Sequence, residues 1–163
     1  MGKIVLSLLV ENTAGVLSRV AMLFSRRGYN IDSLTVGETQ NPKFSRMTIV
    51  SSGDEEALEQ IGKQVAKLVD VVDVRELPPE ESVYRELMLV KVEVSQEERQ
   101  QVIALANVFR AKIIDVADNS VIIEVTGDIS KEDAFLNLVQ NYKILQVART
   151  GITGLSRGAF DRA

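Results

Sequence analysis

Hydrophobic and polar residues alternate along the first segment of the chain, from Lys3 to Val10. The even-numbered positions of this segment are all apolar and share one face of an extended chain: Ile4, Leu6, Leu8 and Val10. Val5 and Leu9 add apolar side chains to the opposite face. A strand with apolar residues on both faces is typical of a sheet interior, so this pattern predicts a largely buried strand.

The spacing changes to that of a helix between Gly15 and Arg27. Apolar residues recur every three or four positions there, which places them on one helical face: Val16, Leu17, Val20, Leu23 and Phe24. Arg26 and Arg27 fall in the last turn, where cations complement the helix dipole, and Gly28 is placed to end the helix. The segment therefore predicts an amphipathic helix.

Four further elements are predicted before residue 78. Residues 30–38 and 44–51 are strand-like and are joined by a polar turn, which indicates a hairpin. Residues 54–69 carry a second helical stripe of apolar side chains, and residues 71–77 close the pattern as a strand. The predicted order of elements is βαββαβ.

Residues 78–83 begin with two consecutive prolines and two acids, and this composition favours an extended linker. The same order of elements then repeats, with a strand at 84–94, a helix at 96–109, strands at 112–117 and 120–126, a helix at 131–142 and a strand at 143–149. We therefore predict an α+β protein with two tandem ferredoxin-like βαββαβ domains, residues 1–77 and residues 84–163.

Both helices of such a domain cover the same face of its antiparallel sheet. The other face of the sheet then needs a cover. The apolar residues on both faces of the first strand support the same conclusion. We expect another subunit or domain to supply this cover, and hence a homodimer or a higher homo-oligomer.

Composition narrows the chemistry that the chain can perform. Its 163 residues include neither histidine nor cysteine, so it lacks thiol nucleophiles, the commonest metal ligands and the best proton-transfer group near neutral pH. No thiolate metal site is possible, and any catalysis would have to rest on Asp, Glu, Lys, Ser or Tyr side chains. A formal net charge of -4 with 5% aromatic residues argues against a nucleic-acid surface. The first apolar run is too short to span a bilayer, and we expect a cytoplasmic protein without membrane association.

Three of the four predicted helices follow a capping pattern, in which a serine precedes an acid by three residues. The pairs are Ser52 with Glu55, Ser95 with Glu98, and Ser130 with Asp133. The first helix lacks such a pair, and no acidic residue occurs between Asn12 and Asp32.

Two interpretations of the first helix start are open. Its free backbone N–H groups carry partial positive charge and can bind an anion, and Gly15 would let a ligand approach the backbone closely. Alternatively, Asn12 or Thr13 caps the helix, and Gly15 belongs to an ordinary turn.

The last segment, residues 150–158, contains three glycines after a predicted strand. Its spacing fits no phosphate-binding loop, so it indicates a flexible or partner-docking tail. The acids at residues 54–56 open a helix, where acids are electrostatically favoured, and we interpret them as structural.

Two segments of the chain carry a family resemblance. Residues 9–20, LVENTAGVLSRV, and residues 24–36, FSRRGYNIDSLTV, resemble the ACT domain of the regulatory small subunit of acetolactate synthase, also called acetohydroxyacid synthase. The resemblance continues through residues 45–49, 67–71, 85–91, 109–116 and 148–151. GLSRG at residues 154–158 is similar to the C-terminal signature of the family.

The resemblance implies an ACT domain over residues 1–77 in a regulatory, non-catalytic subunit. Members of this family bind the catalytic large subunit of acetolactate synthase, raise its activity, and make it subject to feedback inhibition by valine or a related branched-chain amino acid. The implied cofactors are thiamine diphosphate, Mg and FAD, and all of them belong to the catalytic subunit. The resemblance thus implies no catalytic residue, no metal site and no cofactor in this chain.

The resemblance also implies an effector site shared by two protomers. Its residues would be Asn12, Gly15, Val16, Leu17, Asn30 and Ile31. The backbone amides of Gly15 and Val16 would receive the effector's carboxylate, and the Asn12 amide would hold its polar groups. Asn30 and Ile31 of the neighbouring protomer would complete a pocket whose apolar wall favours a branched aliphatic side chain.

Two alternatives come from other functional classes. A free-standing ACT-domain amino-acid sensor that regulates another partner fits the effector motif, but the resemblance of the second domain argues against it. A stand-alone enzyme fits the predicted fold, but the chain lacks an acid/base constellation.

Overall fold

The computed structural model of the chain describes residues 2–159, which form two compact units. The first unit contains residues 2–84 together with residues 152–159, and the second unit contains residues 85–151. The tail had been predicted to belong to the second domain, within residues 84–163, so its place in the first unit differs from that expectation.

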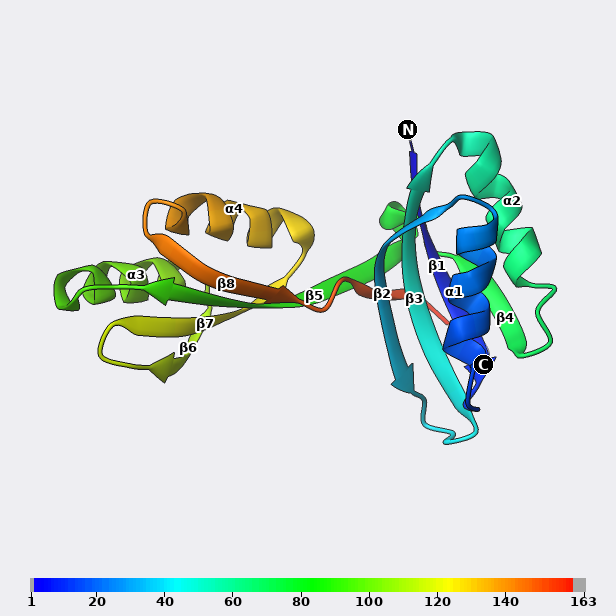
Figure 1. Cartoon of the computed structure of the whole chain (residues 1–163), viewed down its shortest axis with the longest axis horizontal. Helices are drawn as coiled ribbons and strands as arrows, with labels where there is room; N and C mark the ends of the chain where they lie inside the picture. Colours follow the sequence, from blue (N-terminus) through cyan, green and yellow to red (C-terminus); the bar gives the residue numbers. More distant parts are fainter. Residues whose placement is uncertain (1, 160–163) are drawn as a thin grey trace. The chain divides into compact units, whose positions relative to one another are not determined.

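The first unit is a four-stranded antiparallel sheet with two helices on one face (Figure 1). Its elements are β1 (Gly2–Glu11), α1 (Val16–Arg26), β2 (Asn30–Glu38), β3 (Phe44–Gly53), α2 (Glu55–Val65) and β4 (Val71–Glu76). The strand order is β2-β3-β1-β4, as the βαββαβ pattern requires. The α2 helix ends before the predicted residue 69, because the N–H groups of Lys67 and Leu68 bond to carbonyls only three residues earlier.

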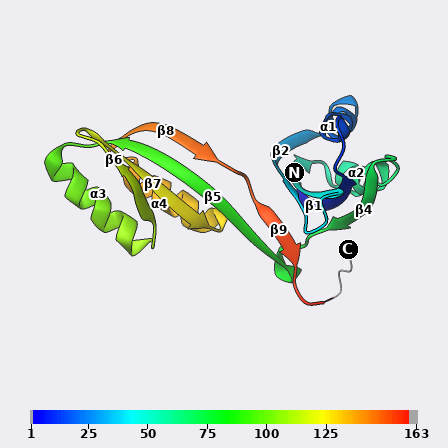
Figure 2. The ribbon, with the colours of Figure 1, turned by 90° about the horizontal axis from the view of Figure 1, so that it is seen from below.

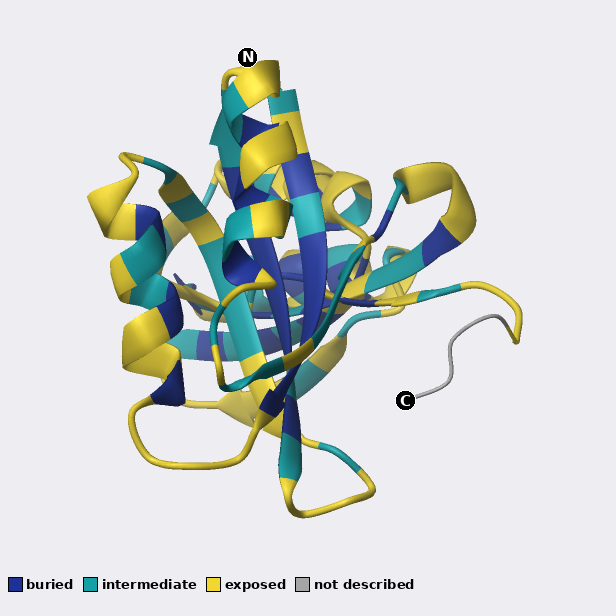
Figure 3. Ribbon diagram, turned by 90° about the vertical axis from the view of Figure 1, so that its right-hand side faces the viewer, coloured by how far each residue is buried: buried dark blue, intermediate teal, exposed yellow. Residues whose placement is uncertain are grey.

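One hydrophobic core fills the space between this sheet and its helices. The even-numbered residues of β1 from Ile4 to Val10 are at most 9% exposed, as their alternation predicts. The helices add Val16, Val20, Phe24, Leu58, Ile61 and Val65. Figure 3 shows buried residues along the strands and exposed residues on the outer turns of the helices. Helical periodicity therefore identified most of the inward-facing residues, but Leu17, which it placed on the same face, is exposed.

The second unit repeats this topology. Its elements are β5 (Ser82–Glu93), α3 (Gln96–Val108), β6 (Lys112–Val116), β7 (Ser120–Gly127), α4 (Ile129–Val139) and β8 (Lys143–Arg149). The strand order is β6-β7-β5-β8. The predicted linker holds a short 3₁₀ helix, η1 (Pro79–Glu81), and β5 begins within it. Two ferredoxin-like units in tandem are thus confirmed.

The tail covers part of the helix-free face of the first sheet. Its strand β9 (Thr153–Ser156) pairs with β5, and Figure 2 shows it beside the start of that strand. Ile152 is 3% exposed, and its carbonyl accepts a hydrogen bond from Thr35 Oγ1 at 3.4 Å. The sequence had suggested a flexible or partner-docking tail, and a cover from another subunit or domain. The chain instead supplies part of the cover itself, because Ile152 is apolar and gains from burial.

Candidate functional site

The start of α1 is open, as one of the two sequence interpretations requires. Gly15 precedes the helix with φ +87°, a left-handed conformation that favours glycine. No side chain among the described residues caps this helix, and its first turn contains no acid. The Asn12 side chain instead donates a hydrogen bond to the Pro42 carbonyl at 3.0 Å. The interpretation of Asn12 or Thr13 as a cap is therefore wrong.

The other helix starts differ from α1 and partly from the prediction. Ser95 accepts a hydrogen bond from the Glu98 N–H at 3.2 Å, which confirms the predicted cap of α3. The α4 helix is capped by Asp128 rather than Ser130, because Asp128 accepts from the Lys131 N–H at 2.9 Å.

Ser52 does not cap α2, although the sequence pattern assigned it that role. It remains in β3, where its hydroxyl donates to Asp32. Asp54 precedes α2 without a side-chain capping bond within the described residues, and Glu55 and Glu56 occupy its first turn. Of the four α-helices that the structure describes, α1 alone begins with neither a cap nor an acid.

Two charged side chains lie at the α1 start. The Arg19 Nε donates to Asp70 Oδ2 at 2.5 Å. The same guanidinium lies over Gly15, because a Cβ atom added to Gly15 would be 2.9 Å from Arg19 Nη1. The helix start therefore carries a side-chain cation beside its backbone N–H groups.

The side chains that follow Gly15 divide between the core and the surface. Val16 is 3% exposed and packs in the core, so only its backbone is available to a ligand. Leu17 is 46% exposed and points outward. This arrangement suits the roles that the resemblance implies for them, a backbone donor and an apolar wall.

Asn30 and Ile31 lie at the start of β2, away from the α1 start. Asn30 pairs with Ser52 near the end of β3, whereas the Asn12 N–H bonds to Lys43, just before β3. The ten residues of β3 separate these two positions by about 30 Å at roughly 3.3 Å per residue. One copy of the chain therefore does not bring the two predicted halves of the site together.

The polar groups of Asn30 are engaged locally. Its side-chain amide donates to Asp32 Oδ1 at 2.6 Å, and its carbonyl accepts from the Ser51 hydroxyl at 2.6 Å. Ile31 is half-buried and packs against the core. These contacts fix the start of β2, where Asn30 is an exposed residue.

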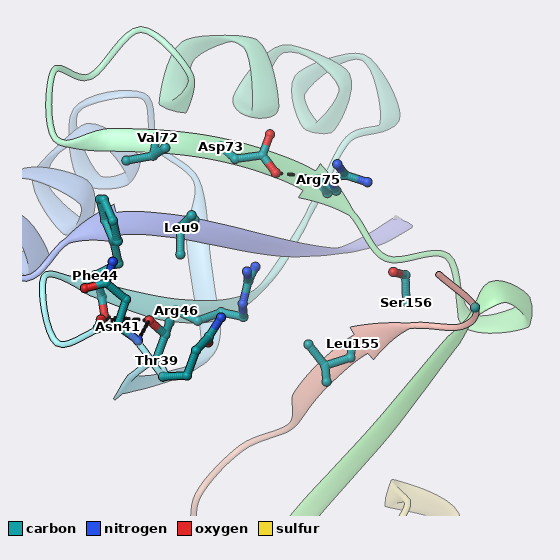
Figure 4. A pocket seen from close by; sticks show the side chains of 12 residues that line it. Leu9, Thr39, Asn41, Phe44, Arg46, Val72, Asp73, Arg75, Leu155 and Ser156 are labelled. Atoms are coloured by element: carbon teal, nitrogen blue, oxygen red, sulfur yellow. Dashed lines mark hydrogen bonds and ion pairs between the residues drawn. The ribbon is translucent and has the colours of Figure 1, made fainter. Parts of the chain in front are cut away.

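A groove of about 810 Å³ lies on the helix-free face of the first sheet (Figure 4). Leu9 forms part of its floor, and the tail residues Leu155, Ser156 and Gly158 line one side. Arg46 donates to Ser7 Oγ at 2.9 Å, and Arg75 pairs with Asp73 at 3.0 Å.

Its remaining lining residues are Thr39, Gln40, Asn41, Phe44 and Val72. None of the six predicted effector residues, all within the described part of the chain, lines this groove. Sequence reasoning missed it because its wall comes from the tail. The strand alternation that puts Leu9 and Arg46 on the same face was the one available signal.

A buried acid in the second unit also went unnoticed in the sequence. Glu132 on α4 is 0% exposed, and Glu86 on β5 is 5% exposed. Burial, followed by contact with the Glu86 carboxyl, raises the pKa of Glu132 to about 7, while Arg149 opposes the shift. Glu132 lies three and seven residues before Phe135 and Val139, so its helical spacing placed it on the buried face.

Within residues 2–159, no group of three or more acidic, histidine or cysteine side chains is arranged to hold a metal ion. No helix in the described part of the chain is long and apolar enough to cross a membrane.

Comparison with known proteins identifies the family. A model described as "AHAS small subunit-like ACT domain" matches residues 6–73, and one described as "Small subunit of acetolactate synthase" matches residues 85–158. A probable acetolactate synthase small subunit of Methanothermobacter thermautotrophicus is 51% identical over 156 residues, covering 95% of this chain and 93% of that protein. The chain belongs to the acetolactate synthase small-subunit family.

Other relatives in this family match over similar lengths. The acetolactate synthase isozyme 3 small subunit of Escherichia coli is 51% identical over 155 residues, covering 94% of this chain and 95% of that protein. The crystal structure of the small subunit from Thermotoga maritima has a TM-score of 0.90 and 45% identity, covering 98% of this chain and 99% of the other. The family resemblance predicted from the sequence is thus confirmed.

Proposed function

We propose that this chain is the regulatory subunit of an acetolactate synthase. In this role it binds the catalytic large subunit, raises its activity, and makes it subject to feedback inhibition by valine in branched-chain amino-acid biosynthesis. The observation that carries the proposal is the family match, which spans both units at about half identity with proteins named as small subunits.

The start of α1 is the proposed carboxylate site for the amino-acid effector. Among the described residues no side chain caps the N–H groups of Gly15 and Val16, and the first turn of α1 contains no acid. A helix start of this kind attracts anions. Asn12 provides a neutral amide that both donates and accepts, which suits a zwitterion. Leu17 supplies exposed apolar surface for the aliphatic side chain.

The second half of the proposed site comes from another copy of the chain. Asn30 and Ile31 lie about 30 Å along the sheet from Asn12, by the rise of a strand. A single pocket that contains both halves therefore requires two protomers. We accordingly propose a homodimer, or a higher oligomer built from such dimers, as the effector-binding form.

A site built from two protomers links effector binding to assembly. Valine stabilises the arrangement of protomers that holds it, and any partner that favours another arrangement weakens valine binding by the same free energy. Inhibition is then a shift in population between arrangements of the complex. In this proposal catalysis and the thiamine diphosphate, Mg and FAD cofactors belong to the large subunit.

Reconstitution with the cognate large subunit tests the proposed function. Purified large subunit is assayed for acetolactate formation alone, with this chain, and with this chain and valine. We expect the chain to raise the rate and valine to lower the raised rate. An unchanged rate under all three conditions would contradict the assignment.

A further inference from the structure

We propose that Arg19 binds the carboxylate of the amino-acid effector together with the α1 backbone, and that Asp70 positions Arg19 for this contact. The inference rests on the proposed effector site and adds a side chain to it. It concerns a residue to which the family resemblance gave no role.

The geometry places Arg19 where a ligand carboxylate would arrive. Side chains of a helix lean toward its N-terminus, so a residue in the second turn reaches back over the first. The Arg19 guanidinium follows this rule, since its Nη1 lies 2.9 Å from where a Cβ of residue 15 would be. An anion bound to the Gly15 and Val16 amides would therefore meet this guanidinium.

Asp70 holds Arg19 by one edge. The Nε donates to Asp70 Oδ2 at 2.5 Å, and the Asp70 side chain is only 16% exposed. The Asp70 carbonyl accepts a hydrogen bond from the Glu11 N–H at 2.9 Å, which ties the turn before β4 to the end of β1. Because Asp70 engages Nε, the Nη1 of the fork is presented toward Gly15.

Asp70 supplies one anion at this place, and it pairs with Arg19 rather than capping the α1 helix. A cation beside a helix N-terminus is unfavourable, because both carry positive potential. Asp70 neutralises part of this potential, and the first turn of α1 supplies no acid of its own. A carboxylate bound between the amides and the guanidinium would satisfy both, and arginine suits carboxylates through its planar fork.

Binding of valine and of valinamide to the full chain tests this role. Valinamide keeps the ammonium and isopropyl groups of valine but replaces the carboxylate by a neutral amide. By calorimetry we expect Arg19→Gln to weaken valine binding roughly ten-fold and to leave valinamide binding nearly unchanged. Arg19→Lys should recover part of the loss, because it retains the charge without the planar fork.

Two further variants separate positioning from charge. Asp70→Asn keeps Arg19 but weakens its anchor, and we expect a smaller loss of the preference for valine over valinamide, roughly three-fold. Lys143→Gln is the matched control, because it removes one cation from the exposed pair with Glu93 in the second unit. It should change neither affinity.

The outcomes distinguish this inference from the proposed function. If the native chain binds no valine, alone or with the large subunit, the proposed valine regulation and the role of Arg19 are both contradicted. If the native chain binds valine and Arg19→Gln binds it equally well, only the role of Arg19 is overturned. Equal weakening of valine and valinamide would also overturn it, because the lost contact would then not be to the carboxylate.

Discussion

The backbone N–H of Gly154 donates a hydrogen bond to Thr48 Oγ1 at 3.3 Å, which joins the tail to the central strand β3 of the first sheet. Thr48 is 1% exposed, so this contact lies in the interior between tail and sheet. Gly154 is tightly surrounded there. A Cβ at this position would lie 2.9 Å from Tyr84 Cδ1 and 3.1 Å from Leu77 Cδ1.

We therefore expect Gly154→Ala to destabilise the chain by about 1–3 kcal/mol through overpacking. The free energy of unfolding from urea denaturation measures the effect. Gly62→Ala is the control, because a Cβ at Gly62 meets nothing within 4 Å and alanine favours a helix. An equal free energy of unfolding for the native chain and Gly154→Ala would contradict this prediction. It would show that the tail shifts to accommodate the added methyl group without loss of stability.

Gly15→Asp should abolish the valine response while leaving activation of the large subunit largely intact. The new carboxylate would be attached beside Arg19 Nη1 and would occupy the place of the effector's carboxylate. The reconstituted assay measures both quantities: activation of the large subunit by the chain without valine, and inhibition of that activity at saturating valine.

Gly15→Asn is the matched control for this variant. Asparagine has the same shape without the charge and tolerates the left-handed conformation of residue 15. It should therefore retain more valine binding than the aspartate. Normal valine binding by Gly15→Asp, measured by calorimetry, would mean that the effector site lies elsewhere.

Mixing two defective chains tests whether the effector site is shared. Gly15→Asp damages one proposed half and Asn30→Ala the other, so each variant alone should lose valine binding. Co-expressed in equal amounts, random dimers should regain about a quarter of the native sites, because half of the sites in mixed dimers are intact. A site contained in one protomer would show no such recovery.

Glu132→Gln should stabilise the chain above neutral pH. The folded-state pKa of Glu132 is about 7, above its ordinary value of 4.5. The unfolded chain therefore loses this proton at a lower pH than the folded chain does. The contribution of Glu132 to the free energy of unfolding is fully present below about pH 4.5 and is lost as the pH rises to about 7. Each pKa unit corresponds to about 1.4 kcal/mol, so the variant should gain stability at pH 8 relative to pH 5.

Chemical denaturation of both chains at these two pH values measures that difference. Glu97→Gln, at an exposed acid of α3, serves as the control and should show no comparable gain. A constant difference between native chain and Glu132→Gln at pH 5 and pH 8 would contradict the assignment of a buried, protonated carboxyl.

Local patterns predicted most of this structure because they report local geometry. The helical repeat of Val16, Val20 and Phe24 identified the buried face of α1. The absence of acids after Asn12 indicated an open helix start as one of two interpretations, and the structure decided between them. The resemblance then selected the residues of the proposed site.

Features that depend on distant partners were not predictable in the same way. Ser52 has the right spacing to cap α2, but the pairing of β3 with β2 holds it in the sheet beside Asp32. The tail strand packs on Thr48, Leu77 and Tyr84, which lie far from it in the sequence. No local pattern in the tail predicts these contacts.

The place of the tail makes the second unit an insertion within the first. The chain leaves the first unit after Tyr84 and re-enters it at Ile152. A fragment cut at residue 77 would thus lose the tail that contacts Thr48, a residue that the intact chain keeps from water. To isolate the first unit, which holds the proposed effector site, residues 2–84 would have to be spliced directly to residues 152–159.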